Sequence, residues 1–440
     1  MRKPSNKPLP ILPALALGVD FGTSGVRLAL VNRSGDTLEE QATPYPGSFE
    51  HPEAWRQGFL QLLLRVPPTR KQQIRAVALA GTSGTLLLCR EDGSLLEGAL
   101  GQALPYHQAC ADQLPEVKRL LGAVEHHPAA QASGSLARAL NLLDQARKIG
   151  TPGALLIRHQ ADWLMGWLLG CWRWGEDGNN LRLGWDLASR TWLGSLAQAK
   201  WSWALPEMVP SGAVLGHVSP EVAASLGLSP DCQVVAGTTD ANAAVLAADP
   251  AMEEGITVLG STLVLKQFVP EPIQEAGLSC HRVNGRWLVG GASNTGAALL
   301  SRYFSSAMLE ELSRQINPEV GTGLQLRPLL GRGERFPVED PQLEPILEPR
   351  PVSDARFLQA LLEGITAIEQ QGWQRFLELG APPIRRIITL GGGARNAQWR
   401  RLRQRVLGLP ILNRPNLSAA RGMALLARGK MEMISPASAR

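Results

Sequence analysis

The sequence predicts an α/β protein with two domains. Its 440 residues exceed the size at which a single hydrophobic core usually keeps growing. Between residues 17 and 80, strand-like runs alternate with a helical segment at residues 52–64, which is typical of a layered α/β domain. The turn Gly22-Thr23-Ser24 has a weak copy at Gly260-Ser261-Thr262, again between apolar runs, which indicates an internal repeat. We expect domains at residues 1–245 and 246–440.

Composition argues against several classes of protein. Hydrophobic residues make up 44% and charged residues 19%, and no apolar run approaches the roughly 20 residues that span a bilayer. The basic start before Ile11 faintly imitates a secretion signal, but Pro13 interrupts the apolar part. We therefore expect residues 1–17 to be an arm leading into the first strand of a cytoplasmic protein without a membrane partner.

The cysteines and the net charge bear on disulfides, zinc binding and nucleic-acid binding. The five cysteines are widely spaced and form no C-x-x-C pair, so we expect free thiols and neither disulfides nor a zinc site. The net charge of +5 raises nucleic acid as a partner. Its basic residues are scattered, however, and the cluster at residues 395–405 is expected to be a solvated helix face. We expect no nucleic-acid partner; an anionic substrate suits the charge equally. The cysteines are Cys89, Cys110, Cys171, Cys232 and Cys280.

The opening stretch, residues 17–31, predicts a β-hairpin with a polar tip. Two apolar runs flank the turn at residues 22–25, and Asp20 ends the first run. Backbone N–H groups and hydroxyls at such a turn can hold phosphate oxygens, and a carboxylate at the strand end can hold a metal ion or its waters. An ordinary hairpin with turn-forming residues explains the same pattern.

Two later stretches in the first half repeat this theme. The segment Gly81-Thr82-Ser83-Gly84 follows the strand expected at residues 74–80, so two polar tips in one sheet predict a shared cleft. Asp240 lies where the strand at residues 232–236 meets an alanine-rich helix, a position suited to function or simply to helix capping. The tryptophan-rich segment at residues 175–203 could cap a sugar ring or seal the core.

The second half is expected to repeat the layered arrangement. At the position equivalent to Asp20 the second copy has Val258, so only the first tip offers a carboxylate. Residues 328–351 are rich in proline and glycine and should form a surface connection. The expected elements are strands at residues 256–265, 287–289 and 386–390 and helices at residues 295–304, 353–379 and 397–407.

Five ordered blocks together resemble the FGGY family of carbohydrate kinases, within the actin and hexokinase-like ATPase superfamily. The resemblance covers nearly the whole chain. It implies two ribonuclease-H-like (actin/hexokinase-like) domains with a cleft between them, and ATP and Mg²⁺ as cofactors. The blocks are Asp20-Phe21-Gly22-Thr23-Ser24, Gly237-Thr238-Thr239-Asp240, Leu259-Gly260-Ser261-Thr262, Gly364 with its helix, and Gly391-Gly392-Gly393-Ala394-Arg395-Asn396.

Within this family the chain is most similar to the cyanobacterial and plant pentulose kinases related to xylulokinase. D-ribulose is therefore the first acceptor to expect, with D-xylulose or another polyol as the alternative and a non-sugar actin-like ATPase as a remote one. The chain departs from better-known members in both sugar-side loops, so their sugar contacts do not transfer, and Ser418 replaces a family glutamate. The segments that carry this similarity are Gly81-Thr82-Ser83-Gly84, Tyr106-His107-Gln108-Ala109 and Gln160-Ala161-Asp162-Trp163.

The resemblance and the needs of phosphoryl transfer assign roles to these residues. Asp240 is expected to be the general base, Asp20 to act at Mg²⁺ and the transferring phosphoryl group, and Ser83 to hold the sugar. No G-x-x-x-x-G-K-[ST] sequence occurs, so the phosphate site is not a P-loop. A monomer and a homodimer fit the sequence equally. The expected phosphate contacts are Thr23, Ser24, Gly260, Ser261 and Thr262, and the expected nucleotide contacts are Gly392, Gly393, Asn396 and Trp399.

Overall fold

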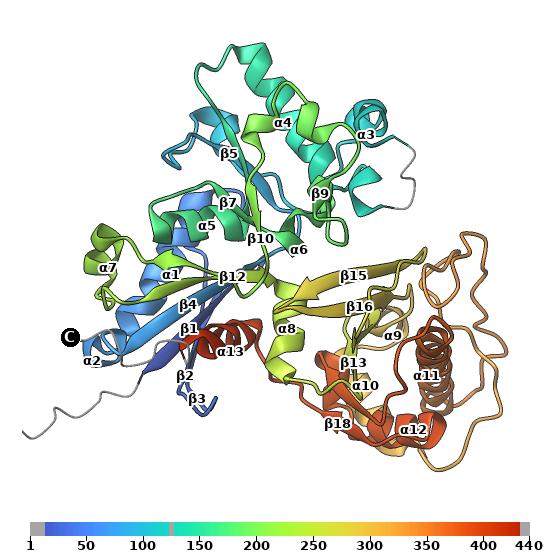
Figure 1. Ribbon diagram of the computed structural model, residues 1–440. Coiled ribbons are helices and arrows are strands. Elements are labelled where there is room, and N and C mark those ends of the chain that lie inside the picture. The colour runs from blue at the N-terminus through green and yellow to red at the C-terminus, as the bar shows by residue number, and fades with distance from the viewer. Residues whose placement is uncertain (1–13, 123–126, 432–440) are drawn as a thin grey trace, which may run out of the picture. The chain divides into compact units, whose positions relative to one another are not determined.

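The computed structural model describes residues 14–122 and 127–431, which divide into two compact units. The first unit holds residues 14–186, 190–247 and 419–431 of this described part, and the second holds residues 187–189 and 248–418. Each unit contains a six-stranded sheet (Figure 1). The arm expected before the first strand lies largely outside the described residues, which begin at Ala14.

The sheet of the first unit has the strand order β11-β12-β4-β1-β2-β3. Strand β1 pairs in parallel with β4 and antiparallel with β2, and β12 pairs in parallel with β4. The hairpin predicted at the start of the chain is confirmed, with Asp20 directly opposite Arg27. The strands are β1 (Leu15–Phe21), β2 (Gly25–Val31), β3 (Thr37–Pro44), β4 (Ile74–Gly81), β11 (Val214–His217) and β12 (Gln233–Thr239).

Helices cover both faces of this sheet, and every residue of β1 is buried as a result. On one face, Phe21 contacts Phe59 of helix α1 (Pro52–Arg65), with ring centroids 6.2 Å apart. On the other face, Gly18 lies against helix α13 (Ala419–Met431). Since side chains alternate between the two faces of a strand, residues 18 and 21 point to opposite sides.

Helix α13 reaches the first unit only after the chain has passed through the second. It contacts β1, β2, β4 and β12, although it lies inside the range expected for the C-terminal domain. Two glycines permit this approach. A Cβ on Gly18 would stand 2.0 Å from the carbonyl oxygen of Ala420, and one on Gly422 would stand 1.9 Å from that of Ala243.

A smaller core lies beside the first sheet and is built from two helices and a short two-stranded sheet. Trp192 and Trp201 pack against this core, which favours the core-sealing interpretation of the tryptophan-rich segment. The remaining elements of the unit are α2 (Pro68–Lys71), β5 (Leu86–Cys89), α3 (Leu114–Leu121), α4 (Ser135–Ile149), β6 (Leu156–His159), α5 (Gln160–Leu169), β7 (Trp174–Glu176), α6 (Asp177–Asn180), β8 (Trp185–Asp186), β9 (Thr191–Trp192), β10 (Glu207–Val209), α7 (Pro220–Leu226) and α8 (Asp240–Ala248).

The second unit repeats the pairing pattern of the first, as the internal repeat predicts. Its sheet has the order β15-β16-β14-β13-β17-β18, and β13 pairs antiparallel with β14 and in parallel with β17. The expected surface connection at residues 328–351 contains no helix or strand. The elements are β13 (Glu254–Leu259), β14 (Leu263–Val269), β15 (Leu278–Val283), β16 (Arg286–Ala292), α9 (Ala297–Tyr303), α10 (Ser306–Gln315), α11 (Asp354–Glu378), β17 (Arg386–Leu390), α12 (Ala397–Leu407) and β18 (Ile411–Asn413).

A buried ion pair ties the helices of the second unit to its sheet. Glu369 of α11 accepts hydrogen bonds from Arg403 of α12 at 2.7 and 2.6 Å, and both side chains are almost fully buried. Thr257 of β13 donates to Glu369 at 2.6 Å, and Arg403 donates to Thr389 of β17 at 2.7 Å. Removing either charged partner would leave the other buried and uncompensated, so the pair holds four elements together.

All five cysteines are free, as the sequence predicts. Among the described residues, no helix is long and apolar enough to cross a membrane.

The contact between β1 and α13 makes a testable prediction. Gly18→Val would drive a side chain into the helix backbone, which cannot move aside, so we expect the free energy of unfolding to fall by about 3 kcal/mol or more. Urea denaturation of the two proteins measures this difference. Gly429→Ala in the same helix is the matched control, because a Cβ there meets nothing within 4 Å. It should raise stability by about 0.5–1 kcal/mol. Equal stability of the Gly18→Val variant and the wild type would contradict this packing.

Candidate active site

The turn between β1 and β2 presents two exposed hydroxyls. Thr23 and Ser24 are exposed at its tip, while the N–H of Gly22 donates to the carbonyl oxygen of Gly25 at 3.0 Å. The hydroxyl of Tyr45 donates to the carbonyl oxygen of Gly22 at 2.8 Å. These two bonds fix the backbone of the turn, and its exposed hydroxyls can donate hydrogen bonds to a phosphate group that arrives from solvent.

Asp20 lies at the base of this turn and is 3% exposed. Burial raises the pKa of its carboxyl group, and the guanidinium of Arg27 opposes that rise through an ion pair of 3.1 Å. Asp20 Oδ2 accepts from Arg27, whereas Oδ1 is buried without a hydrogen-bond partner in the described part of the chain. Since buried carboxylate oxygens are normally paired, Oδ1 fits a metal ion or metal-bound water, which is how Mg²⁺ usually meets protein carboxylates.

Three neighbouring strands of the first sheet end together and carry the predicted acceptor-side residues. Phe21 of β1 and Thr239 of β12 are both in register with Gly81 of β4. The strands β1, β4 and β12 are mutually parallel, so the turn after β1, the Ser83 turn after β4 and Asp240 after β12 lie at one edge of the sheet. The carboxyl ends of parallel strands are the usual place for ligands in α/β sheets.

Asp240 begins α8, as the sequence predicts, and its Oδ1 accepts a hydrogen bond from the N–H of Ala241 at 2.7 Å. The side chain is half-buried. This bond to the first turn of the helix agrees with the helix-capping role that the sequence left open for Asp240. An N-terminal helix position also favours the ionised carboxylate, which is the form that accepts a proton.

Gln160 and Tyr45, to which the sequence reasoning assigned no role, support the Ser83 turn and the turn after β1, respectively. Gln160 Oε1 accepts from both the backbone N–H and the hydroxyl of Thr82, each at 2.9 Å. The hydroxyls of Thr82 and Thr85 lie 2.6 Å apart. Gln160 belongs to a motif quoted for the family resemblance, so it could have been singled out. Tyr45 carried no signal beyond the rule that buried tyrosine hydroxyls need a partner.

The second unit has the corresponding turn between β13 and β14. The N–H of Gly260 donates to the carbonyl oxygen of Thr262 at 3.2 Å. The first turn of α9 lies directly on it, because the N–H groups of Ala297 and Ala298 donate to the carbonyl oxygens of Gly260 and Ser261 at 3.0 and 3.1 Å. These bonds hold the turn at the start of a helix.

A cavity of about 840 Å³ in the second unit brings the predicted nucleotide residues together. This volume is within the range of small-molecule sites. Asn396 caps α12 by accepting from the N–H of Trp399 at 2.9 Å, and it donates to Ser313 of α10 at 2.8 Å. Helix α10 is a wall of this cavity that sequence reasoning did not assign. The predicted residues in the lining are Gly392, Gly393, Asn396 and Trp399.

Trp399 and the glycines contribute differently to this cavity. Trp399 is 2% exposed and its Nε1 donates to Thr366 Oγ1 at 3.1 Å, so most of its side chain packs inside the protein below the cavity surface. A Cβ on Gly393 would stand 2.6 Å from that of Leu259, so glycine is required there by the protein itself. A Cβ on Gly392 would meet nothing within 4 Å, which leaves room for close approach by a ligand.

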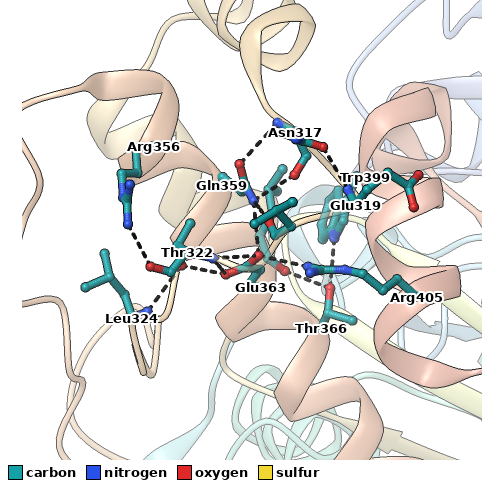
Figure 2. A network of polar contacts seen from close by, with 12 residues as sticks. Asn317, Glu319, Thr322, Leu324, Arg356, Gln359, Glu363, Thr366, Trp399 and Arg405 are labelled. Atoms are coloured by element: carbon teal, nitrogen blue, oxygen red, sulfur yellow. Dashed lines mark hydrogen bonds and ion pairs between the residues drawn. The ribbon is translucent and has the colours of Figure 1, made fainter.

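A polar network joins α11 and α12 to the loop after α10 (Figure 2). Glu363 accepts from Thr322 Oγ1 at 2.6 Å and from Arg405 at 3.0 Å. Gln359 donates to the carbonyl oxygen of Asn317 at 2.9 Å. The network connects the loop after α10 to both helices and so fixes the helix that carries Trp399.

A family model matches most of the second unit and continues into α13. Residues 251–429 match the model for the FGGY family of carbohydrate kinases, C-terminal domain. This part of the chain is therefore similar to the C-terminal domain of those kinases.

Similarity to FGGY kinases extends over most of the chain. A gluconokinase from Bacillus subtilis (strain 168) is 20% identical over 434 residues, covering 88% of this chain and 81% of that protein. A xylulose kinase from the same organism is 24% identical over 458 residues, covering 93% and 87%. The crystal structure of xylulose kinase from Rhodospirillum rubrum has a TM-score of 0.79 at 21% identity, covering 94% and 89%. The predicted fold, two α/β domains of the actin/hexokinase-like kind, is confirmed.

The site residues predicted from the sequence fall into one group in each unit. In the first unit, strand ends bring together the acceptor-side and phosphate residues. In the second, four predicted nucleotide residues line the cavity, and the predicted phosphate turn lies between β13 and β14. The first group is Asp20, Thr23, Ser24, Ser83 and Asp240, and the second is Gly260, Ser261, Thr262, Gly392, Gly393, Asn396 and Trp399.

The ion pair at Asp20 makes a prediction about pH. The charge and hydrogen bond of Arg27 lower the pKa of Asp20, so Arg27→Gln should raise that pKa further. A group with a raised pKa stabilises the fold below its unfolded pKa, and that stability is lost as pH rises through the folded pKa. The variant should therefore lose stability between acid and neutral pH by a larger amount than the wild type. Carbon-detected NMR titration of the Asp20 carboxyl measures the pKa directly, and an unchanged value would contradict the assigned ion pair.

Proposed function

We propose that the protein is an ATP-dependent sugar kinase that transfers the γ-phosphoryl group of ATP to a hydroxyl of a pentulose. D-ribulose is the first acceptor we name, giving D-ribulose 5-phosphate. The observation that supports this most is the alignment of Asp20, the Ser83 turn and Asp240 at the ends of three adjacent parallel strands. A sugar kinase needs a phosphate site, an acceptor site and a proton acceptor, and this edge carries a candidate for each.

In this proposal the chain acts mainly by positioning and by accepting a proton, as phosphoryl transfer requires. Asp240 takes the proton from the attacking hydroxyl, and Ser83 helps to hold the sugar. Asp20 orients the Mg²⁺ and its waters through Oδ1, and the hydroxyls of Thr23 and Ser24 donate to phosphate oxygens. Bound Mg²⁺ supplies neutralisation of phosphate charge. Gly260, Ser261 and Thr262 are proposed as further phosphate contacts.

The nucleotide is proposed to lie in the cavity of the second unit, against Gly392, Gly393, Asn396 and Trp399. We thus assign acceptor and phosphate binding to residues 1–245 and nucleotide binding to residues 246–440. We further propose a cytoplasmic protein, a monomer or homodimer, without nucleic-acid or membrane partners.

D-xylulose is the second candidate acceptor, because xylulose kinases are among the relatives that match the chain along most of its length. Another polyol would use the same chemistry. A non-sugar actin-like ATPase is a third candidate. It would need the phosphate and nucleotide residues but has no use for Asp240 as a base beside an acceptor turn.

Replacing the proposed base tests the mechanism. Asp240→Ala should reduce sugar phosphorylation by about 10²-fold or more while ATP still binds, because general-base catalysis contributes about 10²–10⁴-fold. Sugar-dependent ADP release measures the first effect and calorimetric titration with ATP the second. Asp240→Asn is the matched variant, since an amide can keep the bond to the Ala241 N–H but accepts protons poorly. Turnover retained in both variants would refute the assignment of Asp240 as the base.

The acceptor is tested by comparing kcat/KM for D-ribulose, D-xylulose, L-ribulose and glycerol in an ATP-coupled assay. We expect D-ribulose to have the highest value. A preference for D-xylulose would select the second candidate. ATP hydrolysis that no sugar or polyol stimulates would favour the actin-like ATPase.

A further inference from the structure

Two arginine side chains lie beside the Ser83 turn. Arg138 of α4 is 0% exposed, and Arg182, just after α6, is half-buried. Neither forms an ion pair with an Asp or Glu in the described ranges, whereas the buried Arg403 is paired with Glu369. A buried cation without a counterion is costly, so the arrangement calls for an explanation.

The hydrogen bonds from Arg138 to backbone carbonyl oxygens involve its Nε and Nη1 but not its Nη2. Its Nε donates to the carbonyl oxygen of Gly84 at 3.0 Å, and Nη1 donates to those of Tyr106 and Gln108 at 3.1 and 2.8 Å. Its Nη2 is buried and has no hydrogen-bond partner among the residues that the structure describes. Carbonyl oxygens satisfy N–H groups, but they carry no net negative charge to balance the cation.

The unused end of Arg138 and the side chain of Arg182 converge on one glycine. A Cβ built on Gly84 would meet Arg138 Nη2 at 2.7 Å, Ser135 Oγ at 3.5 Å and Arg182 Cδ at 3.8 Å. Gly84 also has a φ of +97°, so both its conformation and its surroundings favour glycine. Burial, and to a smaller extent the neighbouring Arg182, lowers the pKa of Arg138 to about 10.

The start of α4 adds to the positive charge at this place. The helix has 15 residues, its N-cap is Gly134 without a capping side chain, and its first turn contains no acidic residue. Arg138 stands one turn into the helix and reaches back to Gly84. The positive end of the helix dipole and two guanidinium groups thus face the same region, which is the arrangement that favours an anion.

We propose that Arg138, Arg182 and the N-terminus of α4 form a binding site for a small oxyanion, a carboxylate or phosphate group, next to the turn that carries Ser83. The oxyanion neutralises the two arginines and accepts from Arg138 Nη2. It belongs either to a sugar acid that serves as acceptor or to free inorganic phosphate. The site needs only the first unit, and only the sugar-acid source rests on the proposed kinase function.

Calorimetric titration of the full chain with inorganic phosphate tests the site directly. Arg182→Gln should weaken phosphate binding by about tenfold or more, because a hydrogen bond to a charged group is worth about 1.5–3 kcal/mol. Arg182 makes no hydrogen bond to the described chain, so this variant spares the three backbone bonds of Arg138. Arg173→Gln is the charge-matched control: Arg173 is exposed and stacks on Trp174, 4.0 Å from the ring centroid. It should leave phosphate binding as in the wild type.

Phosphate can also bind at the turn after β1, so Thr23→Val is titrated in parallel. Binding that survives Thr23→Val and is lost in Arg182→Gln belongs to the arginine site. A second assay compares D-gluconate with D-ribulose as acceptors. A fall of about tenfold in the ratio of their kcat/KM values in Arg182→Gln assigns the oxyanion to the acceptor.

The outcomes separate the two proposals. Phosphate binding that depends on Arg182, with no transfer to D-gluconate, supports the site with free phosphate as its ligand. Phosphate affinity and acceptor ratio that are both the same in Arg182→Gln and wild type overturn the site. A complete lack of sugar phosphorylation would refute the proposed function, but the phosphate titration would still decide on the site.

Discussion

The backbone-to-backbone contact between β1 and α13 is the constraint on which the first unit depends. Gly18 and Gly422 have no side chains, so the last helix can lie directly on the first strand and on α8. The strands that α13 contacts are those that end in the Asp20 turn, the Ser83 turn and Asp240. A side chain at either glycine would push the helix away from the sheet that sets the spacing of these groups.

In the second unit a buried ion pair fixes two helices on the sheet. Glu369 and Arg403 bind each other and two threonines on neighbouring strands, so α11 and α12 are held against the sheet by directional bonds. A buried pair of this kind contributes little net stability compared with apolar packing, but it specifies one arrangement. The cavity proposed for the nucleotide is lined by residues of these helices, so the pair helps to fix the positions of Trp399 and Asn396.

The two turns proposed for phosphate and acceptor binding in the first unit are each supported by a polar side chain from elsewhere in the chain. Tyr45 holds the turn after β1 through Gly22, and Gln160 holds the turn after β4 through Thr82. Burial and the nearby charge of Asp20 raise the pKa of Tyr45, so its hydroxyl stays protonated and can donate. Arg138 then joins the acceptor turn to the Tyr106 loop. Buried polar groups thus position both turns, and the turns keep their own hydroxyls for ligands.

The α/β class, the opening hairpin, the repeated turn and the glycine-rich segment at residues 391–393 could be predicted from the sequence, because each depends on residues close together in the chain. The sequence also placed Asp240 at a strand end before a helix. The tertiary structure alone decided that α13 returns to the first sheet, that Tyr45 and Gln160 support the two turns, and that Arg138 and Arg182 meet at Gly84. These contacts join residues far apart in the sequence. A local sequence pattern does not specify which distant backbone segment a glycine or an arginine contacts.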